Sequence, residues 1–272
     1  MRTIAVAAAF AAVSLAAPVA CFAQTAAKAT KPATHVISSI DLAKPFGTRL
    51  PWRFIASQAP GEPDRNGTGD PDPGVIYPCI TANNGKTCLP DTDSVLRLPK
   101  DADGFATPHY LFDARIVQVS KQALLLLQLG SIRADNGDQI NGTQVYAYDQ
   151  GKDSFAPVYA HRTGRNNNQE VRFIDTGPLQ GDIISVDPTP DAPFGYWVSV
   201  NRLEAPGATD SYKEVLRYRS ATAYGDGNPL AVIDAEMPGI QRRMGVWKPG
   251  MPLPAPHDCR APHLVKSVLW CG

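Results

Sequence analysis

The chain has 272 residues, and its 26 Lys and Arg residues balance its 26 Asp and Glu residues, so the formal net charge at pH 7 is +0. Such a balance offers no broad basic surface, so the sequence predicts neither nucleic acid nor an anionic membrane as a partner. After the first 23 residues, no apolar run is long enough to predict a transmembrane segment.

Residues 1–23 have the pattern of a secretory signal peptide, with Arg2, an apolar core over 4–17 and then small residues. The core is too short to span a membrane. Cleavage after Ala23 predicts a periplasmic or secreted protein, whereas acylation of Cys21 would give a lipid anchor. We favour cleavage after Ala23, because Pro18 occupies the position where a lipoprotein signal needs a Leu-like residue.

Four cysteines follow this leader, and an even number in an exported chain predicts two disulfides. Proximity in sequence favours the pairs Cys79–Cys88 and Cys259–Cys271, although four cysteines allow three pairings. Buried thiols and a zinc site are the alternatives. Because no CxxC pair is present and the Asp-rich turns do not form an EF-hand, the sequence predicts no metal centre and no cofactor.

The chain divides into a leader with first strands over 24–57, a Pro- and Gly-rich exposed region over 58–108 and a main β domain over 109–272. The segment Gln58–Pro73 contains four prolines, three glycines and four acidic residues. Such a composition buries little and cannot hold a helix, so we expect a long exposed loop there.

In the main domain, short runs that are apolar, or that alternate apolar and polar residues, are separated by turn signals. These runs recur at a spacing of roughly ten residues. The predicted strands are Leu111–Val119, Ala123–Ile132, Thr143–Tyr148, Phe155–His161, Val171–Ile174, Ile183–Val186, Tyr196–Asn201, Tyr212–Arg219 and Leu230–Asp234. This rhythm predicts an all-β fold of antiparallel sheets, arranged as a sandwich, a barrel or a propeller-like array. We expect an irregular disulfide-stapled N-terminal region, a Pro-rich irregular C-terminal tail after Pro238 and no long amphipathic helix.

Several finer features follow from side-chain alternation. The run LLLLQL within Ala123–Ile132 predicts a strand buried on both faces, with a helix as the alternative. Asn136-Gly137 predicts a tight hairpin turn. In Thr143–Tyr148 the alternation predicts Val145 and Ala147 on one face and Gln144, Tyr146 and Tyr148 on the other. In Tyr212–Arg219 it places Tyr212, Glu214, Leu216 and Tyr218 on one face. A shift of 59 residues aligns Tyr159–Asp175 with Tyr218–Asp234, which raises the hypothesis of a repeated strand–loop–strand unit.

The stretch HRTGRNNNQEVRF, His161–Phe173, concentrates amide and guanidinium side chains between two predicted strands. Such groups donate and accept hydrogen bonds without a shifted pKa, and aromatic faces nearby would complete a surface for a glycan, peptide or protein ligand. The candidate ligand-binding residues are Arg162, Arg165, Asn166, Asn167, Asn168, Gln169, Tyr196 and Trp197. The alternative interpretation is a hairpin tip in open water.

Catalysis is the weaker hypothesis, because no GxSxG nucleophile motif is present. The best acid/base candidates are His161 with Glu170 or Asp175, since a histidine oriented by a carboxylate could serve acyl transfer. The sequence therefore favours an exported, non-catalytic binding protein of the cell envelope. A periplasmic hydrolase of cell-wall glycan or peptide is the second hypothesis, and a structural envelope protein is the third.

Overall fold

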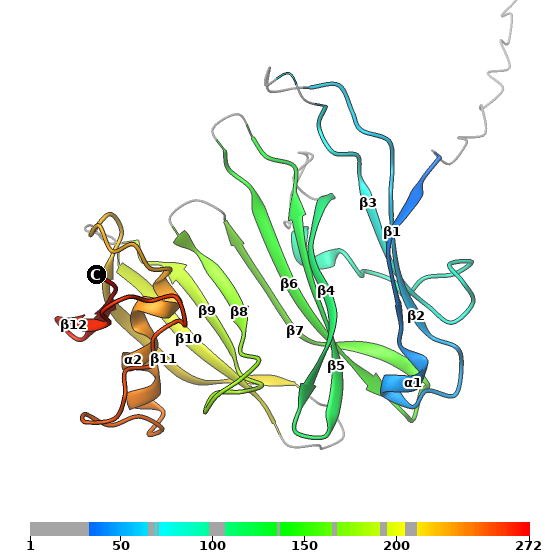
Figure 1. The fold of residues 1–272 in the computed structure, drawn as a ribbon. Helices are drawn as coiled ribbons and strands as arrows, with labels where there is room; N and C mark the ends of the chain where they lie inside the picture. Colours follow the sequence, from blue (N-terminus) through cyan, green and yellow to red (C-terminus); the bar gives the residue numbers. More distant parts are fainter. Residues whose placement is uncertain are drawn as a thin grey trace, which may run out of the picture. The chain divides into compact units, whose positions relative to one another are not determined.

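The computed structural model describes residues 33–64, 69, 71–97, 107–134, 137–164, 168–190, 195–204 and 211–272. Within these residues the strands form four antiparallel sheets (Figure 1). The N-terminal sheet contains β1 (His35–Asp41), β2 (Arg53–Gln58) and β3 (Ile76–Thr81). The central sheet contains β4 (Pro108–Val119), β5 (Gln122–Ser131), β6 (Ile140–Asp149) and β7 (Ser154–Gly164). The third sheet contains β8 (Glu170–Phe173), β9 (Ile183–Pro188), β10 (Gly195–Leu203) and β11 (Tyr212–Ala223), and a small hairpin contains β12 (His263–Val265) and β13 (Val268–Trp270).

The helical elements among the described residues are α1 (Ala43–Phe46), the 3₁₀ turn η1 (Ser94–Leu96) and the longer helix α2 (Val232–Arg243). Each of the three large sheets is a meander, because its strands neighbour one another in chain order. The predicted antiparallel all-β fold is confirmed, and eight of the predicted strands match β4 to β11 to within a few residues at each end. None of the described helices is long and apolar enough to cross a membrane.

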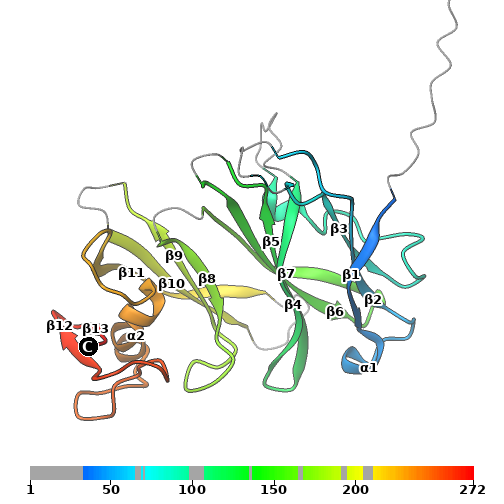
Figure 2. The ribbon, with the colours of Figure 1, turned by 45° about the horizontal axis from the view of Figure 1, so that its top comes forward.

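The sheets stack face to face, and α2 covers the last of them (Figure 1). Leu125 and Leu127 of β5 pack towards the N-terminal sheet, while Leu124 and Leu126 pack towards the third sheet. All four leucines are at most 1% exposed, which confirms the predicted strand that is buried on both faces. Figure 2 shows the same order of layers from a second direction, with α2 beside β11.

The alternation predicted in β6 is confirmed, because Val145 and Ala147 face the third sheet while Tyr146 faces the N-terminal sheet. In β11 the predicted grouping is correct for Leu216 and Tyr218, which share a face, and wrong for Tyr212. Tyr212 packs between the central and third sheets, whereas Leu216 packs against the core beside α2. The pairing of β10 with β11 shifts between Val200 and Asn201, and this β-bulge moves every later side chain of β11 to the opposite face.

The predicted strand Leu230–Asp234 is wrong, since α2 begins at Val232. Apolar side chains at helical spacing, among them Ile233 and Ile240, bury against the third sheet. Pro238 lies inside this helix and removes one backbone hydrogen bond, which is why the segment does not read as helical in sequence. The expectation of an irregular chain after Pro238 is correct for residues 244–262 and wrong at both ends, because α2 continues to Arg243 and the β12–β13 hairpin begins at His263.

The 59-residue echo does not correspond to a repeated structural unit. Its first copy joins β7 to β8, which belong to different sheets. Its second copy joins β11 to α2, so Ile233 and Asp234 are helical where Ile174 and Asp175 follow a strand. Identity at four positions therefore does not determine the secondary structure. The elements against which each segment packs decide between helix and strand.

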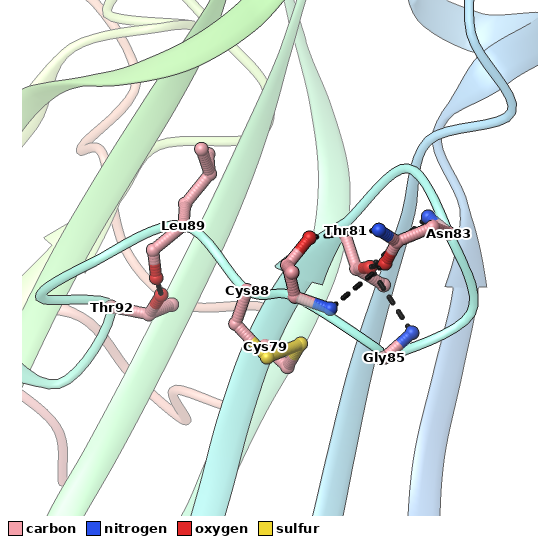
Figure 3. The surroundings of a disulfide bond; sticks show 8 residues. Cys79, Thr81, Asn83, Gly85, Cys88, Leu89 and Thr92 are labelled. Atoms are coloured by element: carbon pink, nitrogen blue, oxygen red, sulfur yellow. Dashed lines mark hydrogen bonds between the residues drawn. A yellow bond between two sulfur atoms is a disulfide. The ribbon is translucent and has the colours of Figure 1, made fainter.

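Both predicted disulfides are present, Cys79–Cys88 and Cys259–Cys271. The first closes the turn that leaves β3 (Figure 3), where Thr81 Oγ1 accepts from Gly85 N and Asn83 Oδ1 accepts from Thr87 N. The region 58–108 was expected to be exposed, but its strand β3 pairs with β2, and the side chains Ile76, Ile80 and Leu96 are buried. β5 and β6 pair as an antiparallel hairpin, and Gly137 has a φ of 83°. The predicted Asn136-Gly137 turn is not fully described, because Asp135 and Asn136 lie outside the described residues.

Candidate functional site

The interface between the central and third sheets has an apolar half and a polar half. The apolar half, nearer the β4–β5 turn, is filled by Val117, Leu124, Leu126, Val145, Phe173 and Ile183. Further along the same face, Thr143 pairs with Gln128 on one side and His161 on the other, and Asn141 pairs with Thr163. Side chains two residues apart on a strand share a face, so Thr143 and Asn141 point to the third sheet as Val145 does.

This polar half contains a cavity of about 350 Å³, at the small end of the usual range for small-molecule sites. Its walls carry the amides of Gln128, Gln139, Asn141 and Gln169, the hydroxyls of Thr143 and Thr163 and the ring of Phe112. The walls come from β4, β5, β6 and β7 on one side and from the start of β8 on the other. The cavity is therefore a cleft between two sheets, at one end of the sandwich.

The amides of the cleft differ in how far their hydrogen bonds are satisfied. Gln128 Nε2 donates to Thr143 Oγ1 at 3.3 Å and to the Val171 carbonyl at 3.2 Å, and thus bridges the two sheets. Gln139 is 3% exposed, and its Nε2 donates to the Ser131 carbonyl at 2.7 Å. By contrast, Asn141 Oδ1 is buried and has no hydrogen-bond partner among the described residues. A ligand with a hydroxyl or N–H group could supply the missing donor.

An aromatic ring stands at the edge of the cleft. Phe112 is 47% exposed, and its ring lies against the backbone of Gly130, where an added Cβ would be 2.5 Å from Phe112 Cε2. Tyr110 stacks beside it, with ring centroids 5.8 Å apart and an interplanar angle of 9°. The guanidinium of Arg133 lies 5.1 Å from the Tyr110 ring centroid. Glycine at position 130 is thus required for the ring to lie flat on β5, and the stack fixes its orientation.

The two charged residues in the cleft wall have partners within the protein. Glu170 Oε1 accepts from the Ile233 N–H at 2.8 Å, in the first turn of α2, and its Oε2 accepts from Arg172 at 3.0 Å. This carboxylate therefore caps the helix, where the helix dipole favours a negative charge. Arg133 is held over the Tyr110 ring. The remaining side chains that line the cleft are neutral.

A larger cavity, of about 740 Å³, lies at the opposite end of β5, beside the β4–β5 turn. Its lining combines Phe46 and Tyr148 with Lys121 and Glu204, and it contains none of the residues singled out by sequence. Size alone favours this cavity. We consider the smaller cleft the better candidate, because its polar groups converge and include the unsatisfied acceptor of Asn141.

The structure divides the predicted ligand-binding residues among several places. Gln169 lines the cleft, and its Oε1 accepts from Gly164 N at 3.0 Å. Arg162 lies on the other face of β7 and donates to the Arg97 carbonyl at 3.2 Å. Trp197 lies on the face of β10 that is directed to the central sheet, with the Arg217 guanidinium 5.1 Å from its ring centroid. The structure does not bring these side chains into one surface.

The other candidates lie outside the cleft or outside the described residues. Tyr196 is 1% exposed and belongs to the core beside α2, and its pKa is raised mainly by burial. The Tyr196 hydroxyl is buried and has no hydrogen-bond partner among the described residues. Asn168 has a φ of 54°, which suits the left-handed conformation that asparagine tolerates. Arg165, Asn166 and Asn167 lie outside the described residues.

The catalytic candidates do not converge. His161 Nε2 lies 3.0 Å from Asp187 Oδ1 of β9, not beside the predicted carboxylates. Glu170 faces α2, and Asp175 receives two hydrogen bonds from Arg115, at 2.6 and 3.0 Å. The described residues contain no group of three or more His, Cys, Asp or Glu that could hold a metal ion.

The sequence analysis missed most of the cleft, namely Phe112, Gln128, Gln139, Asn141, Thr143 and Thr163. One signal was available. Gln128 interrupts an otherwise apolar strand, and Thr143 interrupts the apolar face of β6 two residues before Val145. A polar position inside a buried face marks either a satisfied hydrogen bond or a site. The pairing of these interruptions across neighbouring strands could not be read from one sequence.

Comparison with known proteins gives no assignment. The chain matches no protein-family model, no curated protein and no solved structure.

Proposed function

We propose that the protein is an exported, non-catalytic binding protein that holds a small polar ligand in the cleft between the central and third sheets. The observation that carries the proposal is Asn141, whose buried Oδ1 lacks a partner among the described residues while lining a polar cavity of about 350 Å³. An unsatisfied buried acceptor costs about 1–3 kcal/mol. A ligand donor would remove that cost, and the neighbouring amides and hydroxyls would orient the ligand.

Export to the cell envelope, periplasmic or secreted, rests on two supports. One is the signal-peptide pattern of residues 1–23 in the sequence. The other is the pair of disulfides, which form and persist in oxidising compartments.

The proposal predicts an unusual result for Asn141→Leu. The substitution is close in volume but removes the unsatisfied acceptor, so thermal stability should stay unchanged or rise while ligand binding is lost. Ligands are first found by screening a library of small polar compounds for those that raise the melting temperature of the wild type. Titration calorimetry then compares wild type, Asn141→Leu and the control Gln118→Leu, an exposed position on β4.

A fall in melting temperature on Asn141→Leu would assign Asn141 a structural role. Equal binding by Asn141→Leu and the wild type would place the ligand elsewhere and contradict the proposal.

The contact between His161 and Asp187 supports a second candidate, a hydrolase of cell-wall glycan or peptide, since a carboxylate can orient a histidine base. This candidate requires activity on peptidoglycan or ester substrates that His161→Ala abolishes. Asp187→Asn should then lower the rate and shift its pH profile. Activity that survives both substitutions would exclude a catalytic role for the pair.

A further inference from the structure

We infer that the ligand of this cleft is a neutral saccharide, one ring of which stacks on Phe112. The inference rests on the proposed function and specifies its ligand class. Three properties of the cleft support it: the chemistry of the hydrogen-bonding groups, the absence of uncommitted charge among its described lining residues and the fixed aromatic ring at its edge.

The hydrogen-bonding groups suit a polyol. Side-chain amides present both donors and acceptors, and threonine hydroxyls can act in either role. Sugar hydroxyls have the same dual character, so one ring can satisfy several such groups at different angles. Asn141 Oδ1 needs a donor, which any sugar hydroxyl provides. The amide of Gln128 already bridges the two sheets, which holds the walls of the cleft at a fixed separation before a ligand arrives.

Charge excludes the main competing ligands. A phosphate, a uronic acid or a free amino acid needs an opposite charge in the site, because a buried charge without a partner is costly. Both Glu170 oxygens are engaged, one by the α2 backbone and one by Arg172. Arg133 is stacked on Tyr110 at the rim. The lining therefore favours a ligand without net charge.

The ring of Phe112 offers an apolar surface on which one face of a sugar ring can stack. Exposed aromatic rings are costly to keep in water, yet nearly half of this side chain is accessible. Contact with Gly130 and stacking with Tyr110 hold the ring rigid, so little side-chain entropy is lost when a ligand covers it. The C–H face of a pyranose is apolar and flat enough to lie on such a ring, while its hydroxyls extend into the cleft.

The test uses a panel of short neutral oligosaccharides of hexose and N-acetylhexosamine, with matched uronic acid oligosaccharides and a capped neutral tripeptide as comparison probes. Binding is measured by calorimetry on the full mature protein. We expect a neutral saccharide to bind, with affinity that falls about tenfold or more on Phe112→Ala. Phe112→Trp should retain or strengthen binding, and Tyr77→Ala, an exposed aromatic of the N-terminal sheet, should have no effect.

Gly130→Ala provides an independent check, because a methyl group there would displace the Phe112 ring, the nearest side chain, while of the other cleft side chains only the Gln139 amide, 3.0 Å from the added Cβ, would have to adjust. It should weaken saccharide binding to a similar extent as Phe112→Ala. Since Gly130 is buried, its melting temperature is measured in parallel. If it does not fold, Phe112→Ala at the exposed position still decides the matter.

The outcomes separate the inference from the proposed function. Binding of the tripeptide or of a uronic acid, but of no neutral saccharide, with dependence on Asn141, would overturn the saccharide and keep the cleft as a binding site. Saccharide binding that is insensitive to Phe112→Ala and Asn141→Leu would overturn both. Absence of binding by every neutral saccharide would overturn the inference.

Discussion

Replacement of Glu236 by alanine should detach α2 from the third sheet. The side chain is 3% exposed, and both of its oxygens accept hydrogen bonds from β11. Oε1 accepts from Thr222 N at 2.9 Å and from Thr222 Oγ1 at 2.6 Å, and Oε2 accepts from Tyr218 OH at 3.0 Å. The Thr222 N–H, the Thr222 hydroxyl and the Tyr218 hydroxyl would lose their acceptor. At about 1–3 kcal/mol each, the expected loss is about 3–9 kcal/mol, a large share of the usual 5–15 kcal/mol of a domain.

Glu236→Gln is the matched control, because its carbonyl oxygen can still accept from Thr222 and the Tyr218 hydroxyl can turn to accept from the new amide. The expected loss is about 1 kcal/mol, for the exchange of a charged acceptor by a neutral one. Urea unfolding followed by tryptophan fluorescence reports on this region, since the buried Trp247 lies just after α2. Equal midpoints for Glu236→Ala and Glu236→Gln would refute the reasoning, because the network would then contribute nothing.

Two further predictions concern the same core and interface. Burial is the main cause that raises the pKa of Tyr146, Tyr159 and Tyr212 in the folded protein. As the pH rises, the unfolded chain therefore loses its tyrosine protons before the folded protein does. The free energy of unfolding should be constant up to about pH 10 and then fall by about 1.4 kcal/mol per pH unit for each tyrosine. Urea midpoints between pH 7 and pH 11 check this slope, and a flat profile would contradict it. Arg115→Gln removes the paired hydrogen bonds to Asp175, and because Arg115 is 39% exposed the loss should be about 0.5–1 kcal/mol, measured by the same unfolding assay; a larger loss would show that this contact holds the two sheets together.

The strands could be predicted because the burial of each face of a strand determines whether its alternate residues are apolar or polar. The four leucines of β5 and the alternation of β6 needed no knowledge of their neighbours. The face reversal in β11 could not be predicted, since the extra residue of a bulge looks like any other residue of the strand. The identity of α2 was hidden for a different reason. Pro238 argues against a helix locally, and only the burial of Ile233 and Ile240 against the third sheet offsets its cost.

The site was harder to predict than the fold, because no single segment contains it. The stretch His161–Phe173 contributes Thr163, Gln169, Glu170 and Val171, but the unsatisfied acceptor, the bridging amide and the exposed aromatic ring lie on β6, β5 and β4. The composition of the sequence therefore indicated the segment that connects β7 to β8. It did not indicate the strands that form the walls of the cleft.

The polar half of the cleft is difficult to explain by stability alone. The interface between the central and third sheets already has an apolar half that packs Leu126, Val145 and Ile183. Apolar side chains at the next positions along the same face would bury more apolar surface. They would stabilise the folded protein more than a buried acceptor without a donor does. The cleft instead places Asn141 and Thr143 on that face, with a cavity between the sheets. Proteins keep such locally unfavourable positions where function requires them, and a bound ligand that completes the hydrogen bonds would restore the missing stability.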